Sequence, residues 1–324
     1  MSMYGMKLPA LCAFLCLIAC SVVFSAAPMA GTQAPGYFRM MLGDFEITAL
    51  LDGTSEFSPE LLLNTTPALT KKLWEQQFIF SGKAPGCVNA FLINTGKHLI
   101  LIDAGAGGVF GPTMGFAVEN LRASGYRPED VDTILLTHLH GDHVGGLIGK
   151  DGERVFPNAV VMVSKAENET WLSAEEAAKA PPARQNSFSL VRKAAAPYLA
   201  AKCWKTFEPG AELFPGLQTV AATGHTPGHT AYLVTSNNQQ LLFMGDVIHN
   251  AATQFSHPSI AVQYDSDSVK AVECRKAVFS RLARDKILAA GAHLAFPGIG
   301  YLRAEGAGYV WIPVTRPLPG STAQ

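Results

Sequence analysis

The amino-acid sequence predicts an α/β protein built from layered, mixed β-sheets. Short apolar runs typical of strands alternate with longer segments typical of helices, and hairpin signals lie near the start of the chain. The chain has 324 residues, of which 48% are hydrophobic and 16% charged, so it can bury an ample core in one large domain or two small ones. A formal net charge of −1 with no basic cluster gives no support for a nucleic-acid partner.

Residues 1–27 predict a secretory signal peptide rather than part of the fold. Lys7 ends a short n-region, residues 8–24 are apolar apart from Cys and Ser, and small residues follow at 25–27. Pro28 disfavours cleavage directly after Ala27, which leaves the cleavage site open. An uncleaved anchor is the alternative, because the apolar run is barely long enough to span a bilayer, and residues 17–20 also resemble a lipoprotein signal. We expect a periplasmic or secreted protein that keeps no membrane span after cleavage.

The cysteines fit an exported protein without a disulfide framework. Three of the six lie within the signal segment, and the remaining Cys87, Cys203 and Cys274 are far apart with no Cys-x-x-Cys pair. An oxidising compartment permits one disulfide among them, and the sequence leaves its pairing open.

A Pro-, Gly- and Ala-rich linker at 28–36 precedes the folded domain, which is expected to span 37–324. Residues 39–50 predict two strands about a Gly-Asp turn, 55–85 a loop and a short helix, and 88–93 with 98–102 a hairpin. Further strands are expected at 132–137, 159–163, 217–222, 230–235, 241–244 and 287–290. Helices are expected at 119–124, 166–178, 186–201 and 268–284.

The stretch 137–143 carries the strongest chemical signal. His138 and His140 lie two apart at a strand's end and so point the same way, and the chain then turns and offers Asp142 and His143. Zinc is usually held by imidazole nitrogen and carboxylate oxygen, with an open position for water in catalytic sites. Four such groups exceed what one catalytic zinc needs, so the spacing suggests two adjacent metals. The alternative is that Asp142 N-caps a helix and the histidines are surface residues.

A second histidine-bearing segment, Gly-His-Thr-Pro-Gly-His at 224–229, offers two candidate imidazoles. We assign His229 as a metal ligand, because it adjoins the strand expected at 230–235 and should be better held. His225 is left as a supporting or plain loop residue.

Three more polar residues end apolar strands. Asp246 follows 241–244, where a charge is costly unless it is paired or metal-bound, and its two oxygens can bridge two metals. A helix cap or an ion pair is the alternative there. His293 follows 287–290 in the same way, and Asp103 follows 99–102. We expect Asp103 to orient a ligand or a loop, since such support fixes the tautomer and ring orientation of a metal-binding histidine.

These residues together resemble the metal pattern of the metallo-β-lactamase superfamily: His-x-His-x-Asp-His, then a lone His, then Asp, then His. Residues 34–40, 42–50 and 292–300 resemble the secreted methyl parathion hydrolase branch, which also includes lactone-cleaving enzymes. The resemblance implies an αββα sandwich of two mixed β-sheets flanked by helices. It also implies one metal on His138, His140 and His229, and a second on Asp142, His143 and His293, with Asp246 and a hydroxide bridging.

The implied ligand set supports hydrolysis without a protein nucleophile. Two metals about 3.5–4 Å apart lower the pKa of a bridging water and polarise the oxygen under attack. The sequence has no Gly-x-Ser-x-Gly motif that would supply a serine instead. We expect two divalent ions, Zn²⁺ first and Mn²⁺, Co²⁺ or Fe²⁺ as alternatives, and a hydroxide that attacks a lactone or aryl-ester carbonyl. Asp142 and Asp246 are the expected catalytic side chains.

Other branches fit the sequence less well. Redox di-iron relatives carry a carboxylate where His140 stands, and penicillin-opening relatives commonly place Cys at Asp246 and lack His143. Nucleic-acid-cleaving relatives need a basic surface. The alternatives that remain are an organophosphate triester hydrolase, a less favoured β-lactamase and, from a different class, a non-catalytic periplasmic binding protein, against which the intact ligand set argues. The sequence also leaves a homodimer open.

The resemblance extends to a small-molecule pocket. Phe110, Trp171 and Phe188 match the aromatic lining of methyl parathion hydrolase by motif-to-motif spacing, although core packing is nearly as good a reading of each. His249 stands where that enzyme has an aliphatic residue, and Leu62 where it has Arg. An imidazole beside the metals and the loss of the Arg donors favour lactone or aryl-ester cleavage over phosphotriester cleavage.

Overall fold

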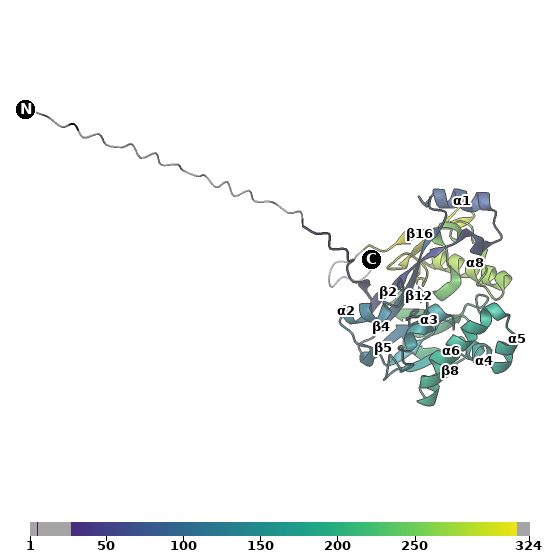
Figure 1. Cartoon of the computed structure of the whole chain (residues 1–324). Helices are drawn as coiled ribbons and strands as arrows, with labels where there is room; N and C mark the ends of the chain where they lie inside the picture. Colours follow the sequence, from purple (N-terminus) through teal and green to yellow (C-terminus); the bar gives the residue numbers. More distant parts are fainter. Residues whose placement is uncertain (1–4, 6–26, 316–324) are drawn as a thin grey trace, which may run out of the picture. The chain divides into compact units, whose positions relative to one another are not determined.

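The structure is a computed structural model that describes Gly5 and residues 27–315 (Figure 1). The chain divides into two units, 1–34 and 35–324. The described residues of the first unit form no helix or strand, and the predicted signal segment lies outside the described residues apart from Gly5 and Ala27. Among the described residues no helix is both long and apolar enough to cross a bilayer.

The second unit contains two seven-stranded sheets, each mixed. The first sheet is antiparallel from β1 to β5 and parallel from β5 to β8. In spatial order its strands are β1 (Tyr37–Leu42), β2 (Phe45–Phe57), β4 (Ala84–Asn94), β5 (Leu99–Ile102), β6 (Thr133–Leu135), β7 (Val160–Ser164) and β8 (Trp204–Phe207).

The second sheet is antiparallel except where β12 and β14 pair in parallel. In spatial order its strands are β16 (Gly308–Pro313), β15 (Ile299–Glu305), β14 (Leu288–Ala290), β12 (Gln239–Phe243), β11 (Thr230–Ser236), β10 (Leu217–Ala221) and β9 (Glu212–Phe214). The hairpin β15–β16 was not predicted from the sequence.

A shared apolar core lies between the two sheets. Strand side chains alternate between faces, so Ile100 and Ile102 of β5 enter this core together with Tyr232 and Phe243 of the second sheet. Leu101 of β5 points to the opposite face, into a different core. Both faces of the central strands are therefore buried, which is why these strands read as continuous apolar runs rather than alternating ones.

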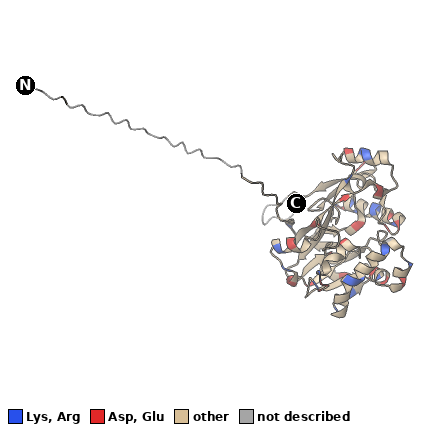
Figure 2. Ribbon diagram, in the orientation of Figure 1, with Lys and Arg blue, Asp and Glu red and all other residues tan. Residues whose placement is uncertain are grey.

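Helices cover the outer face of each sheet. The first sheet packs against α2 (Ala117–Ala123), α4 (Lys165–Trp171) and α6 (Pro182–Ala200), and the second against α8 (Ser268–Asp285). The four layers confirm the predicted α/β sandwich of two mixed sheets flanked by helices. Lys and Arg are interspersed with Asp and Glu along the helices (Figure 2), in keeping with the near-zero net charge.

The remaining elements are short. They include the two-stranded sheet of β3 (Leu62–Leu63) and β13 (Ala261–Val262) and the helices α1 (Pro67–Glu75), α3 (Gly141–Val144), α5 (Ala174–Lys179) and α7 (Ala251–Gln254). Four 3₁₀ turns lie at Pro59–Leu61, Pro128–Asp130, Gly145–Leu147 and Gly245–Val247.

The helix predicted at 166–178 is wrong as a single element. It is split into α4 and α5, because Ser173 adopts an extended conformation and its side chain accepts the N–H of Glu176 as the N-cap of a new helix. The next helix, α6, begins at Pro182 rather than at 186, since proline is well suited to the first helical position.

The polar residues expected at strand ends lie at one edge of the sandwich. Asp103 follows β5, the stretch 137–143 follows β6, Asp246 follows β12 and His293 follows β14, while the segment 224–229 leads into β11. The side-chain contacts among these segments, described next, show that this edge is where the candidate site lies.

Candidate metal centre

The stretch after β6 is held by buried carboxylates from two other parts of the chain. Thr137 donates its N–H and its hydroxyl to Asp103, at 2.8 and 2.9 Å, and the Leu139 N–H donates to Glu167 at 3.0 Å. His140 then takes the N-cap position of α3, so Asp142 lies in the first turn of this helix. The alternative in which Asp142 is the helix cap is therefore wrong.

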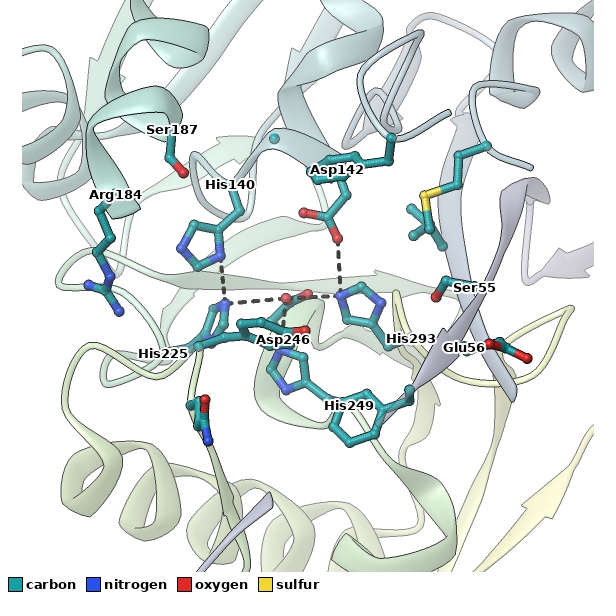
Figure 3. A pocket seen from close by; sticks show the side chains of 18 of the residues that line it. Ser55, Glu56, His140, Asp142, Arg184, Ser187, His225, Asp246, His249 and His293 are labelled. Carbon is teal, nitrogen blue, oxygen red and sulfur yellow. Dashed lines mark hydrogen bonds and ion pairs between the residues drawn. The ribbon is translucent and has the colours of Figure 1, made fainter. Parts of the chain in front are cut away.

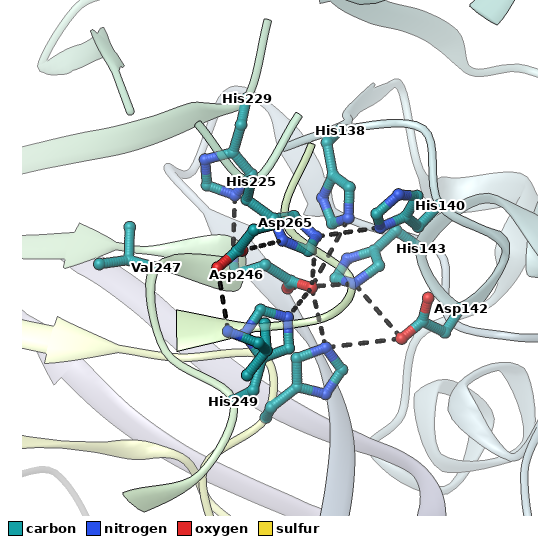
Figure 4. A network of polar contacts seen from close by, with 12 residues as sticks. His138, His140, Asp142, His143, His225, His229, Asp246, Val247, His249 and Asp265 are labelled. Atoms are coloured by element: carbon teal, nitrogen blue, oxygen red, sulfur yellow. Dashed lines mark hydrogen bonds and ion pairs between the residues drawn. The ribbon is translucent and has the colours of Figure 1, made fainter. Parts of the chain in front are cut away.

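Asp246 lies at the centre of a cluster of imidazoles (Figure 4). Its side chain is buried directly after β12, and the Nε2 atoms of five histidines lie 3.0 to 3.6 Å from its two carboxylate oxygens. These five are His293, His249, His143, His225 and His138. One carboxylate therefore faces ring nitrogens contributed by four different segments of the chain.

The side chains around Asp246 form two separate groups of candidate ligands, and within each group the ligand atoms lie within 4.8 Å of one another. A third group, Asp246 with His249 and His293, overlaps both of them. The first group is His138, His140, His225 and Asp246 itself, with the Nε2 of His225 at 3.0 Å from the Nδ1 of His140. The second group is Asp142, His143 and His293. Asp246 also contacts both histidines of the second group, so it is shared between the two.

Four buried atoms in the cluster have no hydrogen-bond partner among the described residues: Nε2 of His138, Nε2 of His143, Nδ1 of His249 and Oδ1 of Asp246. An unpaired buried polar atom costs about 1–3 kcal/mol, so several of them at one place call for a ligand. Imidazole nitrogen and carboxylate oxygen are donors that Zn²⁺ accepts, and other first-row divalent ions accept them too. The residues present thus fit a pair of divalent metal ions.

The electrostatics of the cluster agree with this fit. Burial raises the pKa of the Asp246 carboxyl, but the imidazoles around it, His293 first, outweigh burial and hold this pKa well below its usual range. Burial lowers the pKa of His225, yet its hydrogen bonds to Asp246 and Asp265 raise that pKa to about 9. The two carboxylates therefore stabilise positive charge at His225, as a cation site requires.

The profile of the Metallo-beta-lactamase superfamily matches residues 85–291, a range that contains six of the seven residues in the two groups. This chain belongs to the metallo-beta-lactamase superfamily. The predicted superfamily is confirmed, and the sandwich fold agrees with it.

Two solved structures are similar to this chain over most of its length. The hydrolase AbOPH is 42% identical with a TM-score of 0.84 over 88% of this chain and 99% of that chain. AidC, described as a dizinc quorum-quenching lactonase in complex with a product, is 30% identical with a TM-score of 0.80 over 86% and 98%. An N-acyl homoserine lactonase from Bacillus sp is 33% identical over 117 residues, which span 36% of this chain and only 38% of that relative.

The assignment of His229 rather than His225 as a ligand does not fit the geometry. The Nε2 of His229 accepts the Asp246 N–H at 2.9 Å, and its Nδ1 donates to the Ala222 carbonyl at 2.9 Å. Both ring nitrogens are thus used by the backbone, and burial lowers the pKa of His229 to about 3, so the ring stays neutral. It is His225, the loop residue, whose Nε2 enters the cluster of this superfamily member.

Four cluster histidines are oriented from behind by a second polar group. The Nδ1 of His143 contacts Asp103 at 2.8 Å, that of His225 contacts Asp265 at 3.0 Å, and that of His293 donates to the Cys87 carbonyl at 2.9 Å. The Nδ1 of His138 lies 3.0 Å from the Thr137 hydroxyl. Such contacts fix the tautomer that presents Nε2 to a metal.

Two carboxylates that shape the cluster were missed by the sequence analysis. Glu167 of α4 is fully buried, and it accepts the Leu139 N–H through one oxygen and the Gly228 N–H through the other, at 3.0 and 2.8 Å. It therefore joins the two histidine-bearing loops. Asp265 orients His225 from the loop after β13. Neither residue lies in a pattern that distinguishes it from a surface carboxylate, because its role depends on contacts between distant segments.

A cavity of about 590 Å³ opens above the cluster (Figure 3). His140, Asp142, His225, Asp246 and His293 lie on its floor. Its wall is formed by residues from β2, β4, α4, α6 and the loops, among them Phe110, Trp171, Arg184, Ser187, His249 and Tyr264.

The structure places only part of the predicted pocket at this cavity. Phe110, Trp171 and His249 line it, whereas Phe188 packs behind Trp171 with ring centroids 4.7 Å apart. Leu62 belongs to a separate small core beneath α1 and is 7% exposed. The expectation that Phe188 and Leu62 contact substrate is therefore not supported, because each is covered by its own apolar neighbours.

Proposed function

We propose that this protein is an exported, dinuclear metal-dependent hydrolase that opens lactones or cleaves aryl esters. The observation that carries the proposal is the pair of ligand groups sharing Asp246 at the floor of a cavity large enough for a small organic substrate. The lactonases among the similar proteins support the choice of lactones. The predicted signal segment supports export.

The proposed ligand set corrects the sequence-based one at a single position. One divalent ion would be held by His138, His140 and His225, and the other by Asp142, His143 and His293, with Asp246 available to both. When bound, two such ions activate a water molecule and polarise the oxygen of the group under attack. Zn²⁺ is our first choice of metal, on the strength of the dizinc relative and of the donor types.

The protein's own side chains position these parts and handle the proton. Asp103, Asp265 and the Cys87 carbonyl fix the imidazoles so that no reorganisation is needed during the reaction. Asp142 lines the cavity, so its carboxylate is placed to pass a proton to the departing alkoxide. Phe110 and Trp171 supply an apolar surface on which a lactone or aryl group can lie.

His249 carries the preference for carbonyl over phosphoryl substrates in this proposal. Its ring lies beside Asp246 at 3.1 Å and stacks on His293 with centroids 5.0 Å apart, so a polar imidazole borders the reaction centre. A planar carbonyl can approach past this ring more easily than a tetrahedral phosphotriester with three substituents. Leu62 has no part in this preference, because it lies outside the cavity.

Side-by-side kinetics on lactones and organophosphates test the proposal. We expect kcat/KM for an aromatic lactone or aryl ester to exceed that for methyl parathion or paraoxon by at least about a hundredfold, roughly 2.7 kcal/mol of transition-state discrimination. His249→Leu should narrow the gap by raising phosphotriester turnover. Equal or better phosphotriester efficiency in the unmodified enzyme would instead establish an organophosphate triester hydrolase.

A further inference from the structure

Arg184 places a positive charge on the wall of the cavity, away from the cluster. It lies in the first turn of α6, and Ser187 lies one turn further along the same helix, on the side that faces the cavity (Figure 3). Among the described residues that line the cavity, Arg184 alone is a Lys or an Arg. The charge is therefore a specific feature of one part of the wall.

No described residue compensates this charge. The Arg184 side chain makes no ion pair or hydrogen bond within the described part of the chain, whereas Lys165 and Lys179 on the neighbouring helices are paired with glutamates. Glu56, the carboxylate that lines the cavity outside the cluster, is paired with Lys83 at 2.6 Å. The first turn of α6 also lacks an acidic residue, and a cation there opposes the helix dipole.

The cavity has room for a substrate that reaches from the cluster to Arg184. Its volume of about 590 Å³ lies in the middle of the range of about 300–1,000 Å³ that is typical of pockets for drug-sized ligands. A bare lactone ring would leave much of this space unfilled. The substrate is thus expected to carry a substituent remote from the bond that is broken.

We propose that Arg184 binds a carboxylate on this remote substituent, so that the enzyme prefers anionic esters or lactones over neutral ones. A half-buried guanidinium offers paired donors that match a carboxylate, and such charged hydrogen bonds are stronger than neutral ones. Ser187 can donate a further hydrogen bond from the same face of α6. The inference rests on the proposed hydrolase function and names a substrate class for it.

Two 4-nitrophenyl esters with the same leaving group provide the test. One is 4-nitrophenyl hexanoate, and the other is the mono-4-nitrophenyl ester of adipic acid, which has the same chain length and a terminal carboxylate. The metal-loaded enzyme is compared with Arg184→Gln, Arg184→Lys and the control Lys193→Gln, an exposed position on α6 outside the cavity lining. Free adipate and hexanoate binding, measured by calorimetry on the same proteins, gives a readout that needs no turnover.

In the unmodified enzyme, the preference is the kcat/KM of the adipate ester divided by the kcat/KM of the hexanoate ester. We expect Arg184→Gln to lower this ratio by at least about tenfold, mainly by raising KM for the adipate ester. Turnover of the neutral ester should change less than about twofold, Arg184→Lys should keep part of the preference, and Lys193→Gln should keep all of it. A ratio unchanged in Arg184→Gln, or an equal loss with both esters, would overturn the inference. If neither ester is hydrolysed, the proposed function fails. The inference then stands only if Arg184→Gln weakens the binding of free adipate without weakening that of hexanoate, and it fails otherwise.

Discussion

The side chains on the floor of the cavity are more buried and have more hydrogen-bond partners than those on its wall. His138, His143, His225 and His293 each have a polar group behind the ring, and all four are buried or nearly so. On the wall, by contrast, Phe110 and Tyr264 are 52% and 43% exposed, and Arg184 has no fixed partner among the described residues. Substitutions on the floor should therefore change metal binding and chemistry, and substitutions on the wall should change which substrate is accepted.

The largest expected effect is that of Asp246→Ala. The side chain is shared by both ligand groups, so its loss should weaken both metal sites and lower kcat by at least about a thousandfold. Metal content after dialysis and steady-state kinetics measure the two effects, and circular dichroism checks the fold. Asp44→Ala, an exposed turn residue, is the control. A variant that keeps two metals and more than a tenth of the activity would contradict the central place given to Asp246.

An intermediate effect is expected for Glu167→Gln. The amide places N–H groups where one of the two carboxylate oxygens accepted a backbone N–H, so one of the two loops loses its contact. Unfolding free energy should fall by about 1–3 kcal/mol, and metal affinity should fall with it. Denaturant titration and metal titration measure these losses. Glu169→Gln, exposed on the same helix, should change stability by less than about 0.5 kcal/mol, and equal effects at both positions would refute the role of Glu167.

The smallest effect is expected on the wall, at Phe110→Ala. Because this ring is half exposed, stability should change by less than about 0.5 kcal/mol and metal content should not change. KM for an aryl ester should rise a few-fold while kcat stays within about twofold, since the ring contributes uniform binding. Phe80→Ala, at a ring that is 72% exposed and outside the cavity lining, should change neither constant. Loss of metal from the Phe110 variant would show that wall and floor are not separable.

The sequence was sufficient to predict the fold class and most of the strand ends that meet at the site. A continuous apolar run predicts a buried strand, and a polar residue at its end, as at Asp103, Asp246 and His293, predicts a side chain that binds or orients a ligand. The same logic failed at the segment 224–229. His229 adjoins β11, and both of its ring nitrogens form hydrogen bonds with the backbone. The Nε2 of His225, in the loop, is therefore the one that can bind a metal.

Other features could not be predicted because they depend on distant contacts. Glu167 and Asp265 look like ordinary helix and loop carboxylates until the fold brings the histidine loops to them. Leu62 matched a pocket position by spacing, but its strand pairs with β13 and buries it in another core. Spacing along the chain therefore predicted ligands at strand ends better than residues of the pocket wall, which come from strands, helices and loops far apart in the sequence.

Anomalous X-ray diffraction from crystals of the metal-loaded protein, with His225→Ala and His229→Ala beside it, tests the two-metal centre most directly. We predict two anomalous peaks per chain beside Asp246, one of them coordinated by the Nε2 of His225. His225→Ala should lose that peak, whereas His229→Ala should keep both peaks and lose stability instead, because the Asp246 N–H loses its acceptor. A single peak or none, or a peak that disappears in His229→Ala and persists in His225→Ala, would contradict the account.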